Sequence, residues 1–153
     1  MIRRVIVVGG MALVASVLLA FSRPIEMLVD GERVDTDVAP VTTISDKAFV
    51  PLRSIADALG AQTESDAKNG AVTVVLGAQA LRVRVGDKHA IVNGMAFTLK
   101  HAPFRVRGRV MVSLDAVARA LHVHARYDPR NARIEVVTPG IGMAPTSQNA
   151  PAQ

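Results

Sequence analysis

An internal repeat is the feature that most constrains how this chain can fold. Residues 50–61 read VPLRSIADALGA, and a similar apolar pattern returns 62 positions later in residues 112–121. Leu52 and Ile55 belong to a set of apolar residues at helical spacing, which predicts a short helix with one apolar side. Proline is tolerated in a first helical turn, and Gly60 stands where a left-handed C-terminal residue is favoured. The chain is therefore expected to contain two copies of one small unit, each with a short helix.

The residues shared by the two copies indicate which property the repeat preserves. At an offset of 62, the matches are Val50, Leu52, Ala56, Ala58, Leu59, Asp66, Asn69, Val74 and Val75 with Val112, Leu114, Ala118, Ala120, Leu121, Asp128, Asn131, Val136 and Val137. Upstream, at an offset of 63, Val29, Gly31 and Pro40 match Val92, Gly94 and Pro103. All of these are apolar, small or turn residues. The repeat therefore preserves a packing scheme, which favours a scaffold over a duplicated active site.

Turn signals separate short apolar runs on both sides of each helix. Asp30-Gly31 and Asn93-Gly94 strongly predict hairpins, because both central residues of such a turn need positive φ. Strands or extended segments are expected at 25–29, 32–34, 38–44, 48–50, 62–64, 71–76, 80–85, 89–92, 95–97, 104–106, 110–112, 123–127 and 133–137, with turns at 45–47, 66–70, 107–109 and 128–131 and a helix N-cap at Ser113. The predicted fold class is α+β: two related β-hairpin/helix/β-hairpin units (about 25–76 and 88–138), with antiparallel sheets each packed on one short helix.

The N-terminus has the marks of an export signal. Arg3 and Arg4 precede an uncharged apolar run, and small residues stand at Ala20 and Ser22. Residues 1–22 are expected to be a signal peptide cleaved after Ser22, which places the mature chain in the periplasm, at the cell wall or outside the cell. An uncleaved signal anchor is the alternative, since about 17 apolar residues is the lower limit for spanning a bilayer.

Composition limits the remaining possibilities. The chain has no cysteine, which excludes disulfides, lipid attachment through cysteine and thiolate metal sites. Loss of residues 1–22 removes two arginines and no acids, so the formal net charge falls from +5 to +3. This surplus is too small to indicate nucleic acid as a partner, and few aromatics are available for base stacking. Residues 139–153 are rich in Gly, Pro, Ser, Asn, Gln and Ala and predict a disordered tail after a domain at 23–138.

The order of these features resembles a known family. An Asp/Asn-Gly hairpin, the segment V-P-L-R-x-x-A-x-A-L-G-A at residues 50–61, an Asp-containing turn and a Val-rich strand are similar to the copper amine oxidase N-terminal-like domain, also called the stalk domain. The resemblance covers about residues 25–138. In the second copy, Ser113, Asp115 and His122 replace the proline, the arginine and the glycine of the motif.

This resemblance implies an antiparallel sheet wrapped around a helix in an exported, non-catalytic module. Such modules accompany envelope-associated and cell-wall enzymes as accessories or spacers. In the oxidase that gives the family its name, copper and the quinone cofactor belong to a different domain. No cofactor, metal or enzyme activity is therefore expected here, and the expected partner is an envelope polymer or another envelope protein.

Three arginines form the candidate binding site. Residues two apart on a strand project from one face, so Arg105, Arg107 and Arg109 could present three guanidinium groups to an anionic wall or envelope polymer. Two alternatives stay open at this point. Gly108 could form a turn that directs Arg109 elsewhere, and basic strand faces also serve solubility and edge protection.

Two other sets of residues have weaker functional interpretations. His122 and His124 would share a face of a strand, as two metal ligands would, but no third ligand is near in the sequence. The favoured interpretation is a histidine placed against a helix C-terminus. Asp66 and Asp128 each precede an asparagine by three positions, which is typical of turn initiation. A secreted enzyme or inhibitor with a loop site, or a metal-handling protein using His122 and His124, remain alternatives to the binding or scaffold module.

Overall fold

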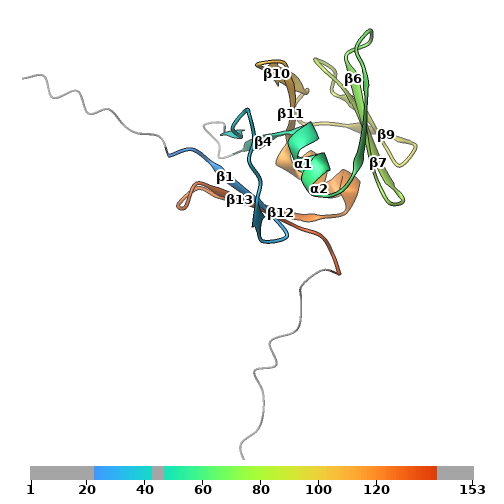
Figure 1. Ribbon diagram of the computed structural model, residues 1–153. Helices are drawn as coiled ribbons and strands as arrows, with labels where there is room; N and C mark the ends of the chain where they lie inside the picture. The colour runs from blue at the N-terminus through green and yellow to red at the C-terminus, as the bar shows by residue number, and fades with distance from the viewer. Residues whose placement is uncertain (1–22, 43–46, 141–153) are drawn as a thin grey trace, which may run out of the picture.

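The part of the chain that the structure describes folds into short strands and two short helices, mostly as the turn signals predict. The computed structural model describes residues 23–42 and 47–140, which form a mixed α+β fold with most strands in antiparallel sheets (Figure 1). The elements are β1 (Glu26–Val29), β2 (Glu32–Arg33), β3 (Val41–Thr42), β4 (Ala48–Pro51), α1 (Leu52–Ala58), β5 (Gln62–Asp66), β6 (Ala71–Leu76), β7 (Gln79–Arg84), β8 (His89–Val92), β9 (Met95–Thr98), β10 (Phe104–Val106), β11 (Arg109–Ser113), α2 (Leu114–Leu121), β12 (His124–Asp128) and β13 (Arg133–Val137). The predicted α+β class is confirmed.

Each of the three sheets combines strands from both halves of the chain. The strand orders are β12-β13-β1-β2, β10-β11-β4-β3 and β5-β6-β7-β8-β9. All pairings are antiparallel except that of β1 with β13, which is parallel and places Glu26 opposite Arg133 and Val29 opposite Val136. Figure 1 shows α1 and α2 near the middle of the molecule with strands around them. The first strand of the fold is therefore held by the last.

The two helices end in the same way. At the end of α1, Gly60 has a φ of 72°, as predicted, and the N–H of Ala61 donates to the carbonyl of Ala56 at 2.8 Å. At the end of α2, His122 has a φ of 53°, and the N–H of the next residue donates to the carbonyl of Ala118 at 3.1 Å. A residue in the left-handed conformation allows such a hydrogen bond, which gives a partner to a backbone carbonyl at the end of the helix that would otherwise have none.

The N-cap of α2 corrects a detail of the sequence analysis. Ser113 is the N-cap residue, with extended backbone, but its hydroxyl makes no capping hydrogen bond. Ser113 is also the last residue of β11, where it lies opposite Phe49 of β4. The strand-to-helix transition therefore sets its conformation, as it does for Pro51 at the start of α1.

One hydrophobic core joins both helices and all three sheets. Val50 and Val112 lie opposite each other in the β4–β11 pair and are 0% and 1% exposed. Ile55 of α1 and Val117 of α2 are both fully buried in the same cluster. Burial of side chains of this kind stabilises a fold by about 1.5–3 kcal/mol each. Packing is therefore sufficient to hold a chain that has no cysteine.

A few expectations differ from the structure or fall outside the described residues. The extended segment predicted at 38–44 contributes only Val41–Thr42 as a strand, while Val38 packs with Phe49 and Met111 in a small second cluster. The predicted turn at 45–47 falls largely outside the described residues, as do the predicted signal at 1–22 and nearly all of the predicted tail. Over residues 23–42 and 47–140, no helix is long and apolar enough to cross a membrane.

Candidate functional site

The β10–β11 hairpin places the three predicted arginines on different faces. Arg107 and Gly108 form the turn, with φ values of 48° and 81°. Val106 lies opposite Arg109, and Arg105 lies opposite Val110. Cross-strand partners share a face and successive residues alternate, so Arg105 and Arg109 project from opposite faces. The structure does not bring the three guanidinium groups together on one face.

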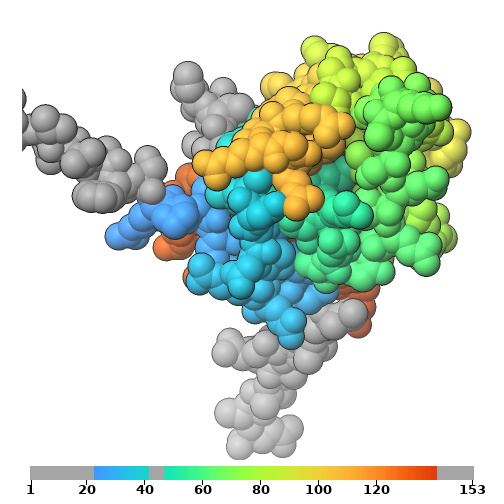
Figure 2. Space-filling view, turned by 45° about the horizontal axis from the view of Figure 1, so that its top comes forward, coloured from blue at the N-terminus to red at the C-terminus, as the bar shows by residue number. Residues whose placement is uncertain are grey.

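Arg109 forms an ion pair with Asp37. Its Nη2 and Nε atoms lie 2.6 and 2.7 Å from Oδ2 of Asp37, in the segment after β2. The hydrogen bond from the guanidinium lowers the pKa of Asp37 below its ordinary value. Arg105 and Arg107 stay exposed, and Nη1 of Arg105 donates to the carbonyl oxygen of Gly108 at 3.2 Å. In Figure 2 this hairpin is the orange segment at the molecular surface.

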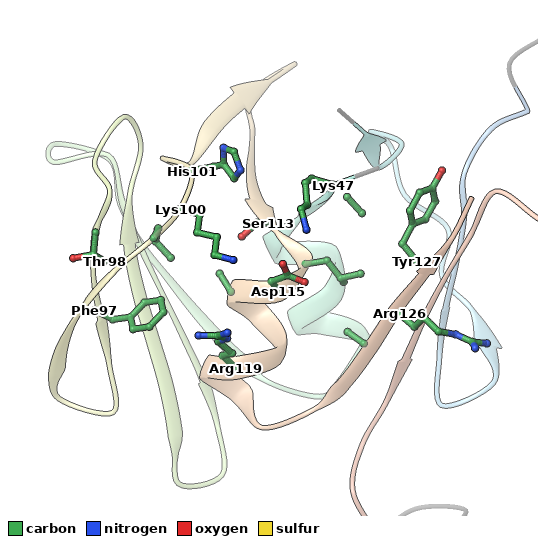
Figure 3. Close-up of a pocket in the computed structure, with 15 residues that line it drawn as sticks. Lys47, Phe97, Thr98, Lys100, His101, Ser113, Asp115, Arg119, Arg126 and Tyr127 are labelled. Atoms are coloured by element: carbon green, nitrogen blue, oxygen red, sulfur yellow. The ribbon is translucent and has the colours of Figure 1, made fainter. Parts of the chain in front are cut away.

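A pocket beside this hairpin gathers charged side chains that the sequence analysis did not connect. It has a volume of about 430 Å³ and lies over the first turn of α2, between the end of β9 and β12. Figure 3 shows the side chains of Lys47 and Lys100 directed toward the carboxylate of Asp115, while the side chain of Arg119 lies further along α2 and points toward Phe97. We call this cavity, defined by its four charged residues Lys47, Lys100, Asp115 and Arg119, the basic pocket.

Three of the four charged residues that define this pocket have no ion-pair partner among the described residues. Lys100, Asp115 and Arg119 form no hydrogen bond or ion pair within residues 23–42 and 47–140. Arg126 also lines the cavity, but in Figure 3 it points away, and its Nη2 lies 3.3 Å from Oε2 of Glu135. The basic pocket therefore combines three basic groups with one carboxylate.

Positive charge is concentrated in one segment of the sequence. Residues 82–109 contain seven lysines or arginines and a single acid, Asp87. Among the described residues, only Arg109 of these seven forms an ion pair. The N–H of His89 donates to Asp87 at 2.8 Å, and this bond is the main cause of the lowered pKa of that carboxyl. Asp87, the single acid of this segment, is therefore already hydrogen-bonded to His89.

The paired aspartates serve their turns, as the sequence predicts. Oδ1 of Asp66 accepts from the backbone N–H of Asn69 at 3.2 Å, and its Oδ2 accepts from the Asn69 amide at 2.6 Å. Asp128 makes the same two bonds with Asn131, at 3.4 and 2.7 Å. The asparagine amide is the main cause of the lowered pKa in both carboxyls. The two aspartates lie in different sheets, and their interpretation as turn residues is confirmed.

Among the described residues, His122 and His124 do not belong to a group of potential metal ligands. His122 is exposed at the end of α2, and His124 is exposed at the start of β12. In the part of the chain that the structure describes, no group of three or more His, Cys, Asp or Glu residues is placed to hold a metal ion. His101 instead contacts the ring of Phe49 edge-on, with centroids 5.5 Å apart.

Fold and site together define a small, strand-rich α+β module in which Asp66 and Asp128 hold turns and Asp37 forms an ion pair. The family model of the copper amine oxidase N-terminal domain matches residues 28–136, so the chain belongs to this family. The predicted family membership is confirmed. The N-terminal domain of this family is a non-catalytic, stalk-like module. No curated protein matches the chain.

Proposed function

We propose that the mature chain is an exported, non-catalytic module that binds anionic polymers of the cell envelope. Membership of a family whose N-terminal domain is stalk-like supports a binding or scaffold role. The basic and apolar residues at positions 3–22 support export. The binding surface includes Arg105 and Arg107 at the exposed turn of the β10–β11 hairpin.

One observation carries this proposal: the unbalanced positive charge of residues 82–109. Seven basic residues stand there against one acid, and only Arg109 is neutralised by an ion pair among the described residues. Elsewhere, Arg33 and Arg133 are compensated by Glu26 at 3.1 and 3.2 Å. Uncompensated positive charge attracts polyanions, and the attraction weakens as salt is added.

We also infer that the units at about 25–76 and 88–138 are related by an approximate two-fold axis. In the β4–β11 pair, Val50 lies opposite Val112, the residue 62 positions later in the repeat. Phe49 pairs with Ser113 and Pro51 pairs with Met111. Exchanging each residue for its equivalent in the other unit turns the first of these pairs into the second. Matching turn bonds at Asp66 and Asp128 support the same relation. A symmetric scaffold of this kind suits a stalk.

The test is retention of the mature chain on purified envelope fractions at increasing salt. We expect retention at about 50 mM salt and release at about 500 mM, where charges are screened within a few ångströms. The Arg105→Ala/Arg107→Ala variant should be released at lower salt. The Lys68→Ala/Arg130→Ala variant loses the same charge from the two aspartate turns and should behave as the wild type.

Two results would contradict the proposal. Failure of the wild type to bind any fraction at low salt would exclude envelope-polymer binding. Equal weakening by both double variants would show that net charge alone acts, without a defined surface. Fractionation of cells that express the full chain, or a chain lacking residues 2–22, tests export separately, because only the full chain should leave the cytoplasm.

A further inference from the structure

The five-stranded sheet β5-β6-β7-β8-β9 has one face in the core and one face turned outward. Val72 and Val74 of β6 belong to the main core, on the side where α1 contacts β5 and α2 contacts β7. Figure 1 shows both helices on this inner side of the sheet. Successive residues of a strand alternate between faces, so Thr73 and Val75 lie on the outer face. Val75 is 39% exposed, and Ile91 of β8, on the same face, is 45% exposed.

The strand register arranges the charged side chains of this outer face in two rows. Residues directly opposite each other in antiparallel strands share a face. Read across β5, β6 and β7, the rows consist of Glu64, Thr73 and Arg82, and of Asp66, Ala71 and Arg84. The carboxylates of both rows therefore stand on β5 and the guanidinium groups on β7, with β6 between them.

The first row leaves its two charges without partners in the described part of the chain. Glu64 and Arg82 are both exposed and form no ion pair among those residues. Neighbouring strands lie about 4.8 Å apart, so the backbones of these two residues are separated by about 10 Å. In the second row, Asp66 is already hydrogen-bonded to Asn69, and Arg84 precedes the turn that contains the single acid of β7–β8. The first row therefore carries the argument.

We propose that this outer face binds a second copy of the same chain, in a two-fold dimer whose axis runs along β6. Such an axis places β5 of each copy over β7 of the other and keeps the rows level. Glu64 of each copy then faces Arg82 of the other, and the second row adds the same arrangement of charges. Val75 meets the Val75 of the other copy at the axis. Stacked sheets pack about 10 Å apart with their strands nearly aligned, a gap that a glutamate and an arginine bridge from opposite sides.

Charge complementarity favours this axis over the other two-fold arrangements that overlap the same strands. An axis across the strands would place β5 over β5 and β7 over β7, with acid against acid and arginine against arginine. An axis along β7 would place Arg82 against its own copy. Like charges in contact strongly disfavour association, whereas a guanidinium and a carboxylate bind each other well. The two rows together are neutral, which suits a second copy of the chain better than a polyanion.

The test measures self-association of the mature chain by sedimentation equilibrium at low salt. We expect the wild type to form dimers, and Glu64→Arg and Arg82→Glu each to weaken dimerisation at least tenfold, because each places like charges opposite each other in both reciprocal contacts. An equimolar mixture of the two variants should form mixed dimers about as tight as those of the wild type. In the mixed dimer, each contact again joins one carboxylate and one guanidinium group.

The control variants Glu32→Arg and Arg130→Glu make the same charge changes at exposed positions of another sheet. Each should dimerise as the wild type does. Circular dichroism checks folding, and if a test variant does not fold, Val75→Glu replaces it, because it places two carboxylates at the axis and should also weaken the dimer.

Three results would overturn the proposal. The first is a wild type that stays monomeric at about 1 mM. The second is dimerisation of folded Glu64→Arg or Arg82→Glu with wild-type affinity, or equal weakening in the control variants. The third is a mixture of the two folded variants that stays monomeric, which would exclude the reciprocal contact. None of these results bears on envelope binding, because Arg105 and Arg107 lie in a different sheet or its turn and the retention test measures their role separately.

Discussion

At the scale of single residues, the end of α2 has a histidine where the end of α1 has a glycine, and this difference costs stability. His122 adopts a φ of 53° where α1 has Gly60 at 72°. A residue with a Cβ pays about 1–2 kcal/mol for left-handed backbone, whereas glycine does not. The second helix therefore ends with a strain that the first helix avoids.

Replacing this histidine should stabilise the protein. We expect His122→Gly to raise the free energy of unfolding by about 1 kcal/mol, because glycine removes the left-handed penalty. Denaturation in urea at pH 7 measures the change. Gly60→Ala is the matched control and should lower stability by about the same amount, since a Cβ at Gly60 has no atom within 4 Å and adds strain alone. A loss of stability in His122→Gly would assign the histidine side chain a stabilising contact.

The backbone conformation of the turn residues was the most predictable feature of the sequence. Asp30-Gly31 and Asn93-Gly94 have positive φ at all four positions, as the hairpin signal requires. The partner of Arg109 could not be predicted in this way. Asp37 lies 72 residues away, and only the assembled sheets bring the two side chains together. The basic pocket could not be predicted either, because Lys47, Lys100 and Asp115 come from segments that only the folded chain brings together.

At the scale of elements, the hairpins β5–β6 and β12–β13 share one turn design. In each, an aspartate accepts hydrogen bonds from the backbone and the side chain of an asparagine three residues later. These bonds are stronger with an ionised carboxylate, so the pKa values of Asp66 and Asp128 are lower in the folded chain.

The acid stability of the fold should depend on these turns. Because the folded pKa values lie below the unfolded value of about 3.9, the carboxylates contribute their full stability above that pH. That stability is lost as pH falls through the lower folded values. We therefore expect the melting temperature to fall below about pH 4. The Asp66→Asn/Asp128→Asn variant should melt lower than the wild type at pH 7, and the gap should shrink toward pH 2. A constant gap would show that ionisation of these groups is not involved.

Local pairing was predictable from the sequence, whereas strand order was not. The β6, β8, β10 and β13 strands match their expected ranges, because each lies between clear turn signals. Val38 did not continue into a strand, since it packs against Phe49 and Met111 instead. No local signal indicates that β1 pairs with β13, or that β4 pairs with β11. Those choices depend on contacts between segments that are far apart in the chain.

At the scale of the whole molecule, the β1–β13 pairing closes the fold. Ile134 and Val136 of β13 are 0% and 1% exposed and belong to the main core. Oδ1 of Asp30 accepts from the N–H of Thr138 at 2.7 Å, and its Oδ2 accepts from the Thr138 hydroxyl at 2.9 Å. The last strand is therefore held by packing and by the first hairpin.

Removing this strand should abolish cooperative folding. A chain ending at Ala132 loses two core side chains, worth about 1.5–3 kcal/mol each, and leaves β1 without its parallel partner. Total stabilities are typically about 5–15 kcal/mol, and the lost strand pairing adds to the deficit. Thermal unfolding followed by circular dichroism should show no cooperative transition. A chain ending at Gly140 is the control and should melt with the wild type, while a normal transition in the shorter chain would contradict this role of β13.

The parallel pairing has a consequence for the newly made polypeptide. Glu26 and Arg133, which meet at 3.2 Å, are 107 positions apart, and the ribosome makes the first long before the second. Contacts of such long range form slowly. The sheet that contains β1 cannot be completed until nearly the entire chain has emerged. Until then, β1 lacks its parallel partner and the main core lacks Ile134 and Val136.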